Sequence, residues 1–163
     1  MKTLLIVRHA KSSWDSDTVS DFDRTLNERG KKDAPMMGAR LLERNIAIDE
    51  FVASPAKRAR KTAELFIEAM NEDSGKLRFE ETLYHAPRDL FYEVISRFYD
   101  DSECVAIFSH NPGITDFVNS LTSTFRTDNM PTAGVAAVTA AIDHWKDFAD
   151  ASKTFLFFDY PKL

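Results

Sequence analysis

Two histidines in this chain follow short apolar runs and lie beside groups that could handle a phosphate anion. Arg8 and His9 follow the run at residues 3–7, and His110 closely follows the run at residues 104–108. A third cluster, which contains Arg58, follows residues 50–54. A neutral imidazole is a competent nucleophile, and guanidinium groups bind phosphate through paired hydrogen bonds. These residue types therefore point to the binding or transfer of a phosphoryl group.

The elements that must position these groups alternate between strands and helices. Apolar runs predict strands at residues 3–8, 50–54, 104–109, 134–142 and 154–159. Helical periodicity predicts helices at 27–44, 55–71 and 88–99 and one that begins near Pro112, with Asn27 and Ser54 as N-caps. This order predicts an α/β fold: a three-layer α/β/α sandwich with a mainly parallel, mixed sheet. At least one of the last two strands is expected to be antiparallel.

In such a sheet the carboxyl ends of parallel strands lie at one edge, where open α/β folds bind ligands. We therefore expect Arg8, His9, Arg58 and His110 to converge there. Neighbouring arginines would lower the pKa of an imidazole and keep it neutral near pH 7. The same cations would stabilise charge on a phosphoryl group in the transition state, so no divalent metal or organic cofactor is expected.

Composition limits the other possibilities. The 163 residues fit one domain, 1–163, and the formal net charge of −5 argues against general nucleic-acid binding. The single cysteine, Cys104, excludes an intrachain disulfide and is expected to be buried. Neither a membrane-spanning apolar stretch nor a signal peptide is visible, so a cytoplasmic protein without membrane partners is expected.

Five blocks of sequence resemble the histidine phosphatase superfamily, in its small SixA-type phosphohistidine phosphatase branch with a phosphoglycerate mutase-like fold. They occur in the family's order and span nearly the whole chain: residues 6–14 (IVRHAKSSW), 23–30 (DRTLNERG), 54–63 (SPAKRARKTA), 109–113 (SHNPG) and 131–133 (PTA). Ala10 replaces the glycine that usually follows the first histidine.

The resemblance implies roles for individual residues. His9 would be the nucleophile that becomes phosphorylated, Arg8 and Arg58 would clamp the phosphoryl group, and His110 would donate a hydrogen bond to it. Arg24 matches a further arginine of the phosphate pocket. From the sequence alone, each of these residues also has a structural interpretation, such as a solvated charge for Arg58 or Arg24.

Other residues have weaker assignments. Ser12 is a candidate for substrate binding, with an ordinary loop residue as the other interpretation. Larger relatives use a carboxylic general acid, and Glu80 and Glu81 lie in roughly the right stretch without a clean match. A protonated imidazole leaving group would need less help from an acid than an alkoxide. His85 and His144 are expected to be structural or exposed.

Three functions remain open on the sequence alone. The first is a metal-independent phosphatase that works through phospho-His9, acts on protein phosphohistidine and releases inorganic phosphate. The second is a phosphatase or mutase that acts on small phosphate esters. The third is a phosphate-binding module without catalysis. A substrate panel and the trapping of a phosphorylated intermediate would separate them.

Overall fold

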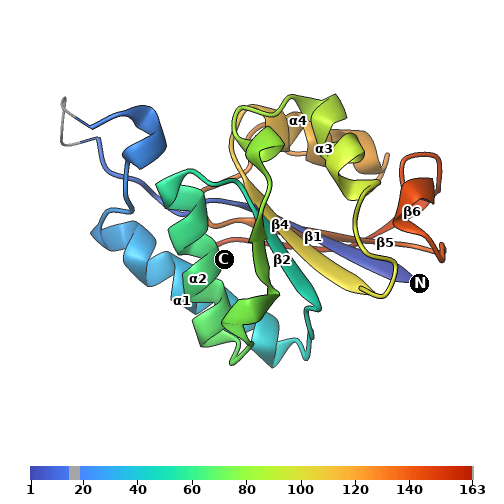
Figure 1. The fold of residues 1–163 in the computed structure, drawn as a ribbon, viewed down its shortest axis with the longest axis horizontal. Coiled ribbons are helices and arrows are strands. Elements are labelled where there is room, and N and C mark those ends of the chain that lie inside the picture. Colours follow the sequence, from blue (N-terminus) through green and yellow to red (C-terminus); the bar gives the residue numbers. More distant parts are fainter. Residues whose placement is uncertain (15–18, 163) are drawn as a thin grey trace.

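A computed structural model describes residues 1–14 and 19–162, and its centre is a six-stranded sheet in the order β3-β2-β4-β1-β5-β6 (Figure 1). The strands are β1 (Lys2–Arg8), β2 (Glu50–Ala53), β3 (Leu77–Phe79), β4 (Cys104–Ser109), β5 (Val135–Ala140) and β6 (Lys153–Asp159). The pairs β1–β4, β2–β4 and β2–β3 are parallel, whereas β1–β5 and β5–β6 are antiparallel. The predicted mixed sheet is confirmed.

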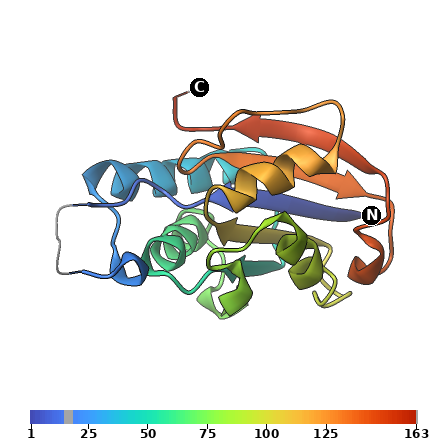
Figure 2. The same cartoon turned by 90° about the horizontal axis from the view of Figure 1, so that it is seen from above.

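Four α-helices cover the two faces of this sheet. They are α1 (Glu28–Glu43), α2 (Lys57–Ala69), α3 (Arg88–Ile95) and α4 (Gly113–Leu121). Figures 1 and 2 show α1 and α2 on one face and α3 and α4 on the other. The predicted three-layer α/β/α sandwich is therefore confirmed. Within residues 1–14 and 19–162, no helix has the length and apolarity that crossing a bilayer requires.

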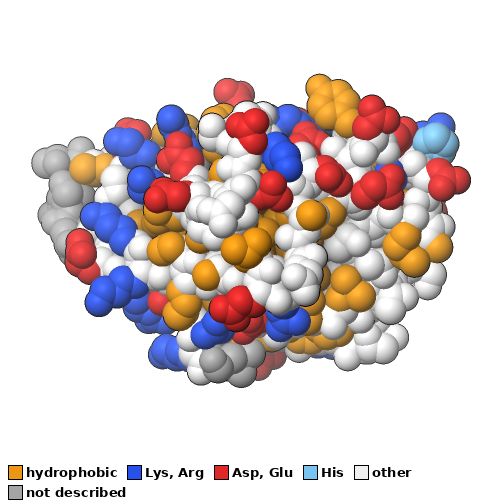
Figure 3. All heavy atoms as spheres, turned by 90° about the horizontal axis from the view of Figure 1, so that it is seen from below, with side chains coloured by type: hydrophobic (Ala, Val, Ile, Leu, Met, Phe, Trp, Pro, Cys, Tyr) orange, Lys and Arg blue, Asp and Glu red, His pale blue; other side chains and the backbone are white. Residues whose placement is uncertain are grey.

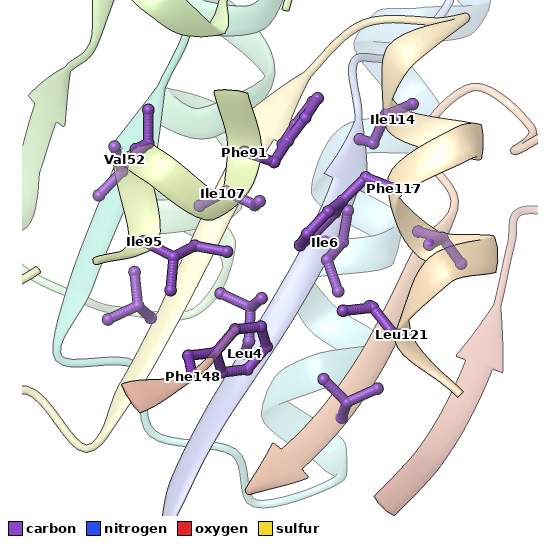
Figure 4. Close-up of a cluster of buried hydrophobic side chains, with 14 of the residues drawn as sticks. Leu4, Ile6, Val52, Phe91, Ile95, Ile107, Ile114, Phe117, Leu121 and Phe148 are labelled. Carbon is purple, nitrogen blue, oxygen red and sulfur yellow. The ribbon is translucent and has the colours of Figure 1, made fainter. Parts of the chain in front are cut away.

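The side chains of β1 alternate between the two faces of the sheet, so this strand contributes to two hydrophobic cores. Successive side chains of a strand point to opposite faces of the sheet. Leu4 and Ile6 pack with α3 and α4 in the cluster of Figure 4, whereas Leu5 and Val7 belong to the cluster beneath α1 and α2. All four are fully buried, so β1 is held firmly from both sides. A strand fixed in this way places the residues at its end rigidly.

Some element boundaries differ from the prediction. The α2 helix begins at Lys57 with Ala56 as N-cap, so the assignment of Ser54 as its N-cap was wrong. Asn27 does cap α1, because its side chain accepts a hydrogen bond from the Gly30 amide. Strand β3 was not predicted; it has only three residues, with an arginine in the middle, and gives no clear apolar run. The α3 helix ends at Ile95, four residues before the predicted end.

Candidate active site

The carboxyl edge of the sheet brings together three residues that are far apart in sequence. The His9 amide donates a hydrogen bond to the Ser109 carbonyl (3.1 Å), which continues the β1–β4 ladder. The Ser54 amide donates to the Phe108 carbonyl (3.0 Å), which continues the β2–β4 ladder. His9, Ser54 and His110 therefore leave three adjacent parallel strands at the same edge.

These strand ends form part of a cavity of about 290 Å³. All six candidate residues from the sequence line it, and so do six others. Its lining consists of Arg8, His9, Lys11, Ser12, Trp14, Asp21, Arg24, Arg58, His85, His110, Asn111 and Thr132. Four of these side chains are cations and one is a carboxylate. The cavity is therefore a local basic pocket on an acidic protein.

His9 is held as a neutral imidazole with a defined tautomer. Its Nδ1 lies 2.8 Å from the Ala10 carbonyl oxygen, which can only accept, so Nδ1 carries the hydrogen. Burial lowers the pKa of His9 to about 3, against the hydrogen bond to Ala10, and the charges of Arg58 and Arg8 lower it further. Burial thus contributes more than the arginines that the sequence suggested. At neutral pH the Nε2 atom therefore has a free lone pair, which a nucleophilic imidazole requires.

His110 lies next to His9, with the two ring centroids 5.1 Å apart. Its Nε2 is 2.7 Å from the Ser54 hydroxyl, and that hydroxyl oxygen lies 3.3 Å from the Ala56 amide, from which it accepts. The hydroxyl oxygen accepts from the Ala56 amide and its hydrogen is free to be donated to Nε2; in that arrangement the ring hydrogen of His110 is on Nδ1. Burial, and then the neighbouring His9, lower the pKa of His110 to about 2.

Three buried side-chain atoms among the described residues have no hydrogen-bond partner, and all three belong to residues that line this cavity. They are Arg8 Nε, Arg58 Nε and His110 Nδ1. A buried polar atom without a partner costs free energy comparable to its lost hydration. Three unpaired donors on residues around one cavity are typical of a site that binds an anion with several oxygens.

Asp21 binds the guanidinium group of Arg58 through both its backbone carbonyl and its carboxylate. Arg58 Nη1 donates to the Asp21 carbonyl (2.6 Å), and Nη2 donates to the Asp21 carboxylate (3.1 Å). The Tyr84 hydroxyl donates to the same carboxylate oxygen (2.7 Å). Partial burial acts to raise the pKa of Asp21, but the Tyr84 hydrogen bond and the charges of Arg58 and Arg24 outweigh it and lower this pKa to about 2. Asp21 is therefore an anion at neutral pH.

Arg24 is also engaged by Asp21. Its Nε and Nη2 atoms lie 3.2 and 3.1 Å from the same carboxylate oxygen, and its Nη1 donates to the Ser12 hydroxyl (2.8 Å). The guanidinium carbon lies 3.5 Å from the centre of the Trp14 ring. In this arrangement each edge of the Arg24 guanidinium already has a protein partner. Arg24 would have to exchange Asp21 for a phosphoryl group in order to bind it through Nε and Nη2.

Comparison with known proteins shows which family this chain belongs to. Residues 4–85 match the sequence profile of the histidine phosphatase superfamily, branch 1. An uncharacterized protein of Mycobacterium tuberculosis is 31% identical over 165 residues, covering 96% of this chain and 100% of that protein. The chain belongs to the histidine phosphatase superfamily. A 2,3-bisphosphoglycerate-dependent phosphoglycerate mutase of Bartonella henselae is 31% identical over 78 residues, covering 47% of this chain and 38% of that enzyme.

Solved structures share the fold of this superfamily member. The protein histidine phosphatase SixA complexed with tungstate superposes with a TM-score of 0.83 at 22% identity, covering 98% of this chain and 97% of that chain. A mycobacterial glucosyl-3-phosphoglycerate phosphatase with VO3 gives 0.70 at 15% identity, covering 99% and 100%. The predicted phosphoglycerate mutase-like fold is confirmed by these similarities.

Two local features hold the loop after His9 in this histidine phosphatase fold. The Ala10 amide donates to the Thr62 hydroxyl (2.9 Å), which in turn donates to the Arg58 carbonyl (2.7 Å). Gly30 packs against the Lys11 backbone so closely that a Cβ at this position would overlap the Lys11 carbonyl. The start of α2 and the start of α1 therefore both fix the loop that carries the pocket residues.

Sequence reasoning missed several residues of the site. Asp21 and Tyr84 gave no signal, because their importance depends on contacts with Arg58 and Arg24 that spacing does not reveal. His85 was expected to be structural or exposed; it is exposed, and it also lines the pocket. Glu80 instead binds Arg78 (3.0 Å) and Arg97 (3.3 Å). Neither Glu80 nor Glu81 belongs to the lining of the pocket.

Proposed function

We propose that this chain is a metal-independent phosphatase that acts through a phospho-His9 intermediate, with protein phosphohistidine as its substrate class. The observation that carries this proposal is a set of three buried donors without partners, Arg8 Nε, Arg58 Nε and His110 Nδ1, on residues that line the same cavity as the neutral His9 ring. A tetrahedral phosphoryl group presents several acceptor oxygens to such donors. Charge-assisted hydrogen bonds from the two arginines would be the strongest of these contacts.

The reaction would proceed in two displacements. In the first, His9 Nε2 attacks phosphorus in line, the P–N bond of the substrate breaks, and the leaving imidazole takes a proton from solvent. In the second, a water oxygen attacks phosphorus, the P–Nε2 bond breaks, and inorganic phosphate leaves as His9 is restored. Arg8, Arg58 and His110 would stabilise the phosphoryl oxygens in both transition states.

The carboxylates near the site are poor proton donors, and this favours phosphohistidine over an alcohol ester as the substrate. An alkoxide leaving group needs a positioned acid, whereas a protonated imidazole leaves more easily. Asp21 is the single carboxylate in the lining of the described pocket, and its pKa of about 2 makes it a poor proton donor at neutral pH. The engagement of Glu80 by Arg78 and Arg97 also removes it from this role.

The role of His9 is tested by trapping the intermediate. Rapid acid-free denaturation during turnover of a labelled phosphoramidate should give a phosphorylated protein whose label maps to His9. His9→Ala should lose turnover and labelling while keeping the fold. His144→Ala is the matched control, because His144 is exposed and pairs with Asp100 rather than with the pocket. Full turnover by the His9 variant would overturn the proposal.

A small phosphate ester is the second candidate substrate. The partial match to a phosphoglycerate mutase and the shared fold with a sugar-phosphate phosphatase favour testing it. A panel of phosphohistidine peptide, phosphoramidate and ordinary esters, assayed with and without chelator, separates the two. We expect phosphoramidates to be hydrolysed in chelator at least about 100-fold faster than alkyl esters, because the alkoxide lacks an acid.

A further inference from the structure

A second cavity, of about 440 Å³, lies beside the proposed phosphoryl site and is lined largely by cations. We call it the basic groove; its residues are Thr25, Leu26, Lys31, Lys57, Arg60, Lys61 and Glu64. Lys57, Arg60 and Lys61 lie in the first turns of α2, and Lys31 lies on α1. Figure 3 shows several Lys and Arg side chains, with Asp and Glu side chains among them, at the end of this face where the two helices begin.

The basic groove and the phosphoryl pocket share a wall. Arg24 lines the pocket and the next residue, Thr25, lines the groove. In the same way, Arg58 lines the pocket and the preceding residue, Lys57, lines the groove. Consecutive Cα atoms are about 3.8 Å apart, so lining residues of the two cavities are adjacent along the backbone at two places. A substrate chain that leaves the pocket can therefore enter the groove within a few residues.

The groove carries positive charge that the protein does not neutralise. Arg60 pairs with Glu64 (3.4 Å), and Lys31 lies 3.6 Å from Glu28. Within residues 1–14 and 19–162, neither Lys57 nor Lys61 makes an ion pair, and both are exposed. A local group of unpaired cations on a protein of net charge −5 creates a positive potential that attracts anionic partners.

We propose that the basic groove binds an acidic segment that flanks the phosphohistidine in the substrate protein. This inference rests on the proposed phosphatase function and names a feature of its substrate. The phosphohistidine occupies the pocket, and Asp or Glu side chains a few residues away lie along Lys57 and Lys61. Charge complementarity of this kind raises the association rate and selects among partners. A small substrate has no acidic segment to place in the groove, so the groove should not raise its kcat/KM.

Charge reversal tests the groove without touching the pocket. The variant is Lys57→Glu with Lys61→Glu, neither of which lines the phosphoryl pocket. The matched control is Lys146→Glu with Lys162→Glu, which makes the same change in net charge at exposed lysines outside both cavities. Each protein is assayed on three substrates: a phosphohistidine peptide with adjacent Asp and Glu residues, the same peptide with Ser and Gln in their place, and phosphoramidate.

We expect kcat/KM of the wild-type enzyme for the acidic peptide to exceed that for the neutral peptide by about tenfold at low salt, and to fall towards it as salt rises. The groove variant should lose this preference, while its rate on phosphoramidate stays within about twofold of wild type. The control should retain the preference. Equal rates on the two peptides with the wild-type enzyme would overturn the groove assignment, and so would an equal loss on phosphoramidate and the acidic peptide.

Failure of the groove and failure of the catalytic proposal give different results. If the wild-type enzyme hydrolyses phosphoramidate and both peptides without preference, the groove proposal alone is wrong. If the wild-type enzyme hydrolyses neither phosphoramidate nor either peptide, the phosphatase proposal itself is wrong.

Discussion

The Ser54 hydroxyl lies 2.7 Å from Nε2 of His110, so this ring nitrogen is already engaged by the protein. The opposite nitrogen, Nδ1, is buried and has no partner among the described residues. When the hydroxyl donates to Nε2, the ring hydrogen is on Nδ1, and the ring as a whole lines the pocket. We therefore expect Ser54 to act as a positioning residue through His110.

Ser54→Ala should lower kcat/KM by about tenfold or more, because the ring can then move its hydrogen to Nε2 and lose the Nδ1 donor that we propose for the phosphoryl group. In a His110→Ala background the same substitution should have almost no further effect, since the two residues act as one unit. Ser109→Ala is the matched control, because that buried hydroxyl donates to the Leu83 carbonyl. Nitrogen NMR shifts of His110 report the tautomer, and additive losses in the double variant would contradict this role.

We expect Asp21 to compete with a phosphoryl group for the two arginines that it contacts. Its carboxylate occupies Nη2 of Arg58 and the Nε–Nη2 edge of Arg24. Asp21→Asn removes the negative charge, so inorganic phosphate should inhibit the variant at roughly tenfold lower concentration. The inhibition constant of phosphate measures this directly.

Asp23→Asn provides the control for that measurement. Asp23 is exposed in the same segment and accepts a hydrogen bond from Ser20, and it does not line the pocket. Its substitution changes net charge equally and should leave the phosphate inhibition constant within about twofold. Weaker phosphate binding by Asp21→Asn would show that Asp21 orients Arg58 and does not compete with the ligand.

Thr62 links the loop after His9 to α2, so the loss of its hydroxyl should lower the stability of the protein. Thr62→Val leaves the Ala10 amide without its acceptor at a fully buried position, which should lower the free energy of unfolding by about 1–3 kcal/mol. Thr62→Ser keeps the hydroxyl and should retain most of this stability. Urea unfolding of the three proteins is the measurement, and equal stability of the Val and Ser variants would contradict the role of the hydroxyl.

The two buried imidazoles should make the protein less stable as pH falls. Folded His9 and His110 bind protons only near pH 3 and pH 2, whereas unfolded histidines bind them near 6.5. Between these values the unfolded chain binds more protons, so stability is complete above about pH 6.5 and decreases below it. Each histidine should contribute a slope of about 1 kcal/mol per pH unit.

Urea unfolding at pH 7.5, 6, 5 and 4.5 measures that slope. The double variant His9→Gln with His110→Gln should show a clearly flatter dependence on pH, because the titrating groups are gone. An unchanged slope in the variant would show that the histidines do not carry the acid sensitivity. The matched His144→Gln variant should behave as wild type, since that side chain is exposed.

The elements that the sequence predicted well are those with strong periodic burial. Strands β1 and β4 are continuous apolar runs because both faces of each are covered, and α2 shows a clear inner stripe. Strand β3 escaped prediction because it is short and borders the sheet, where only β2 pairs with it. Ser54 was misassigned because a serine before a proline satisfies the usual N-cap pattern, although its hydroxyl binds His110.

The sequence alone determined which chemical groups reach the carboxyl edge of the sheet. The alternation of apolar runs and helical patterns predicted a mainly parallel sheet, and Arg8, His9, Arg58 and His110 lie at or just after the ends of the strands that were predicted. The protonation states and hydrogen-bond partners of these groups depend on the tertiary structure. The pKa of His9 depends on burial, and the tautomers of both imidazoles depend on their hydrogen-bond partners. The hydrogen bonds between Asp21 and Arg58 join segments that are far apart in the sequence. Electrostatics and hydrogen bonding act through space over a few ångströms, and residue spacing along a chain does not encode those distances.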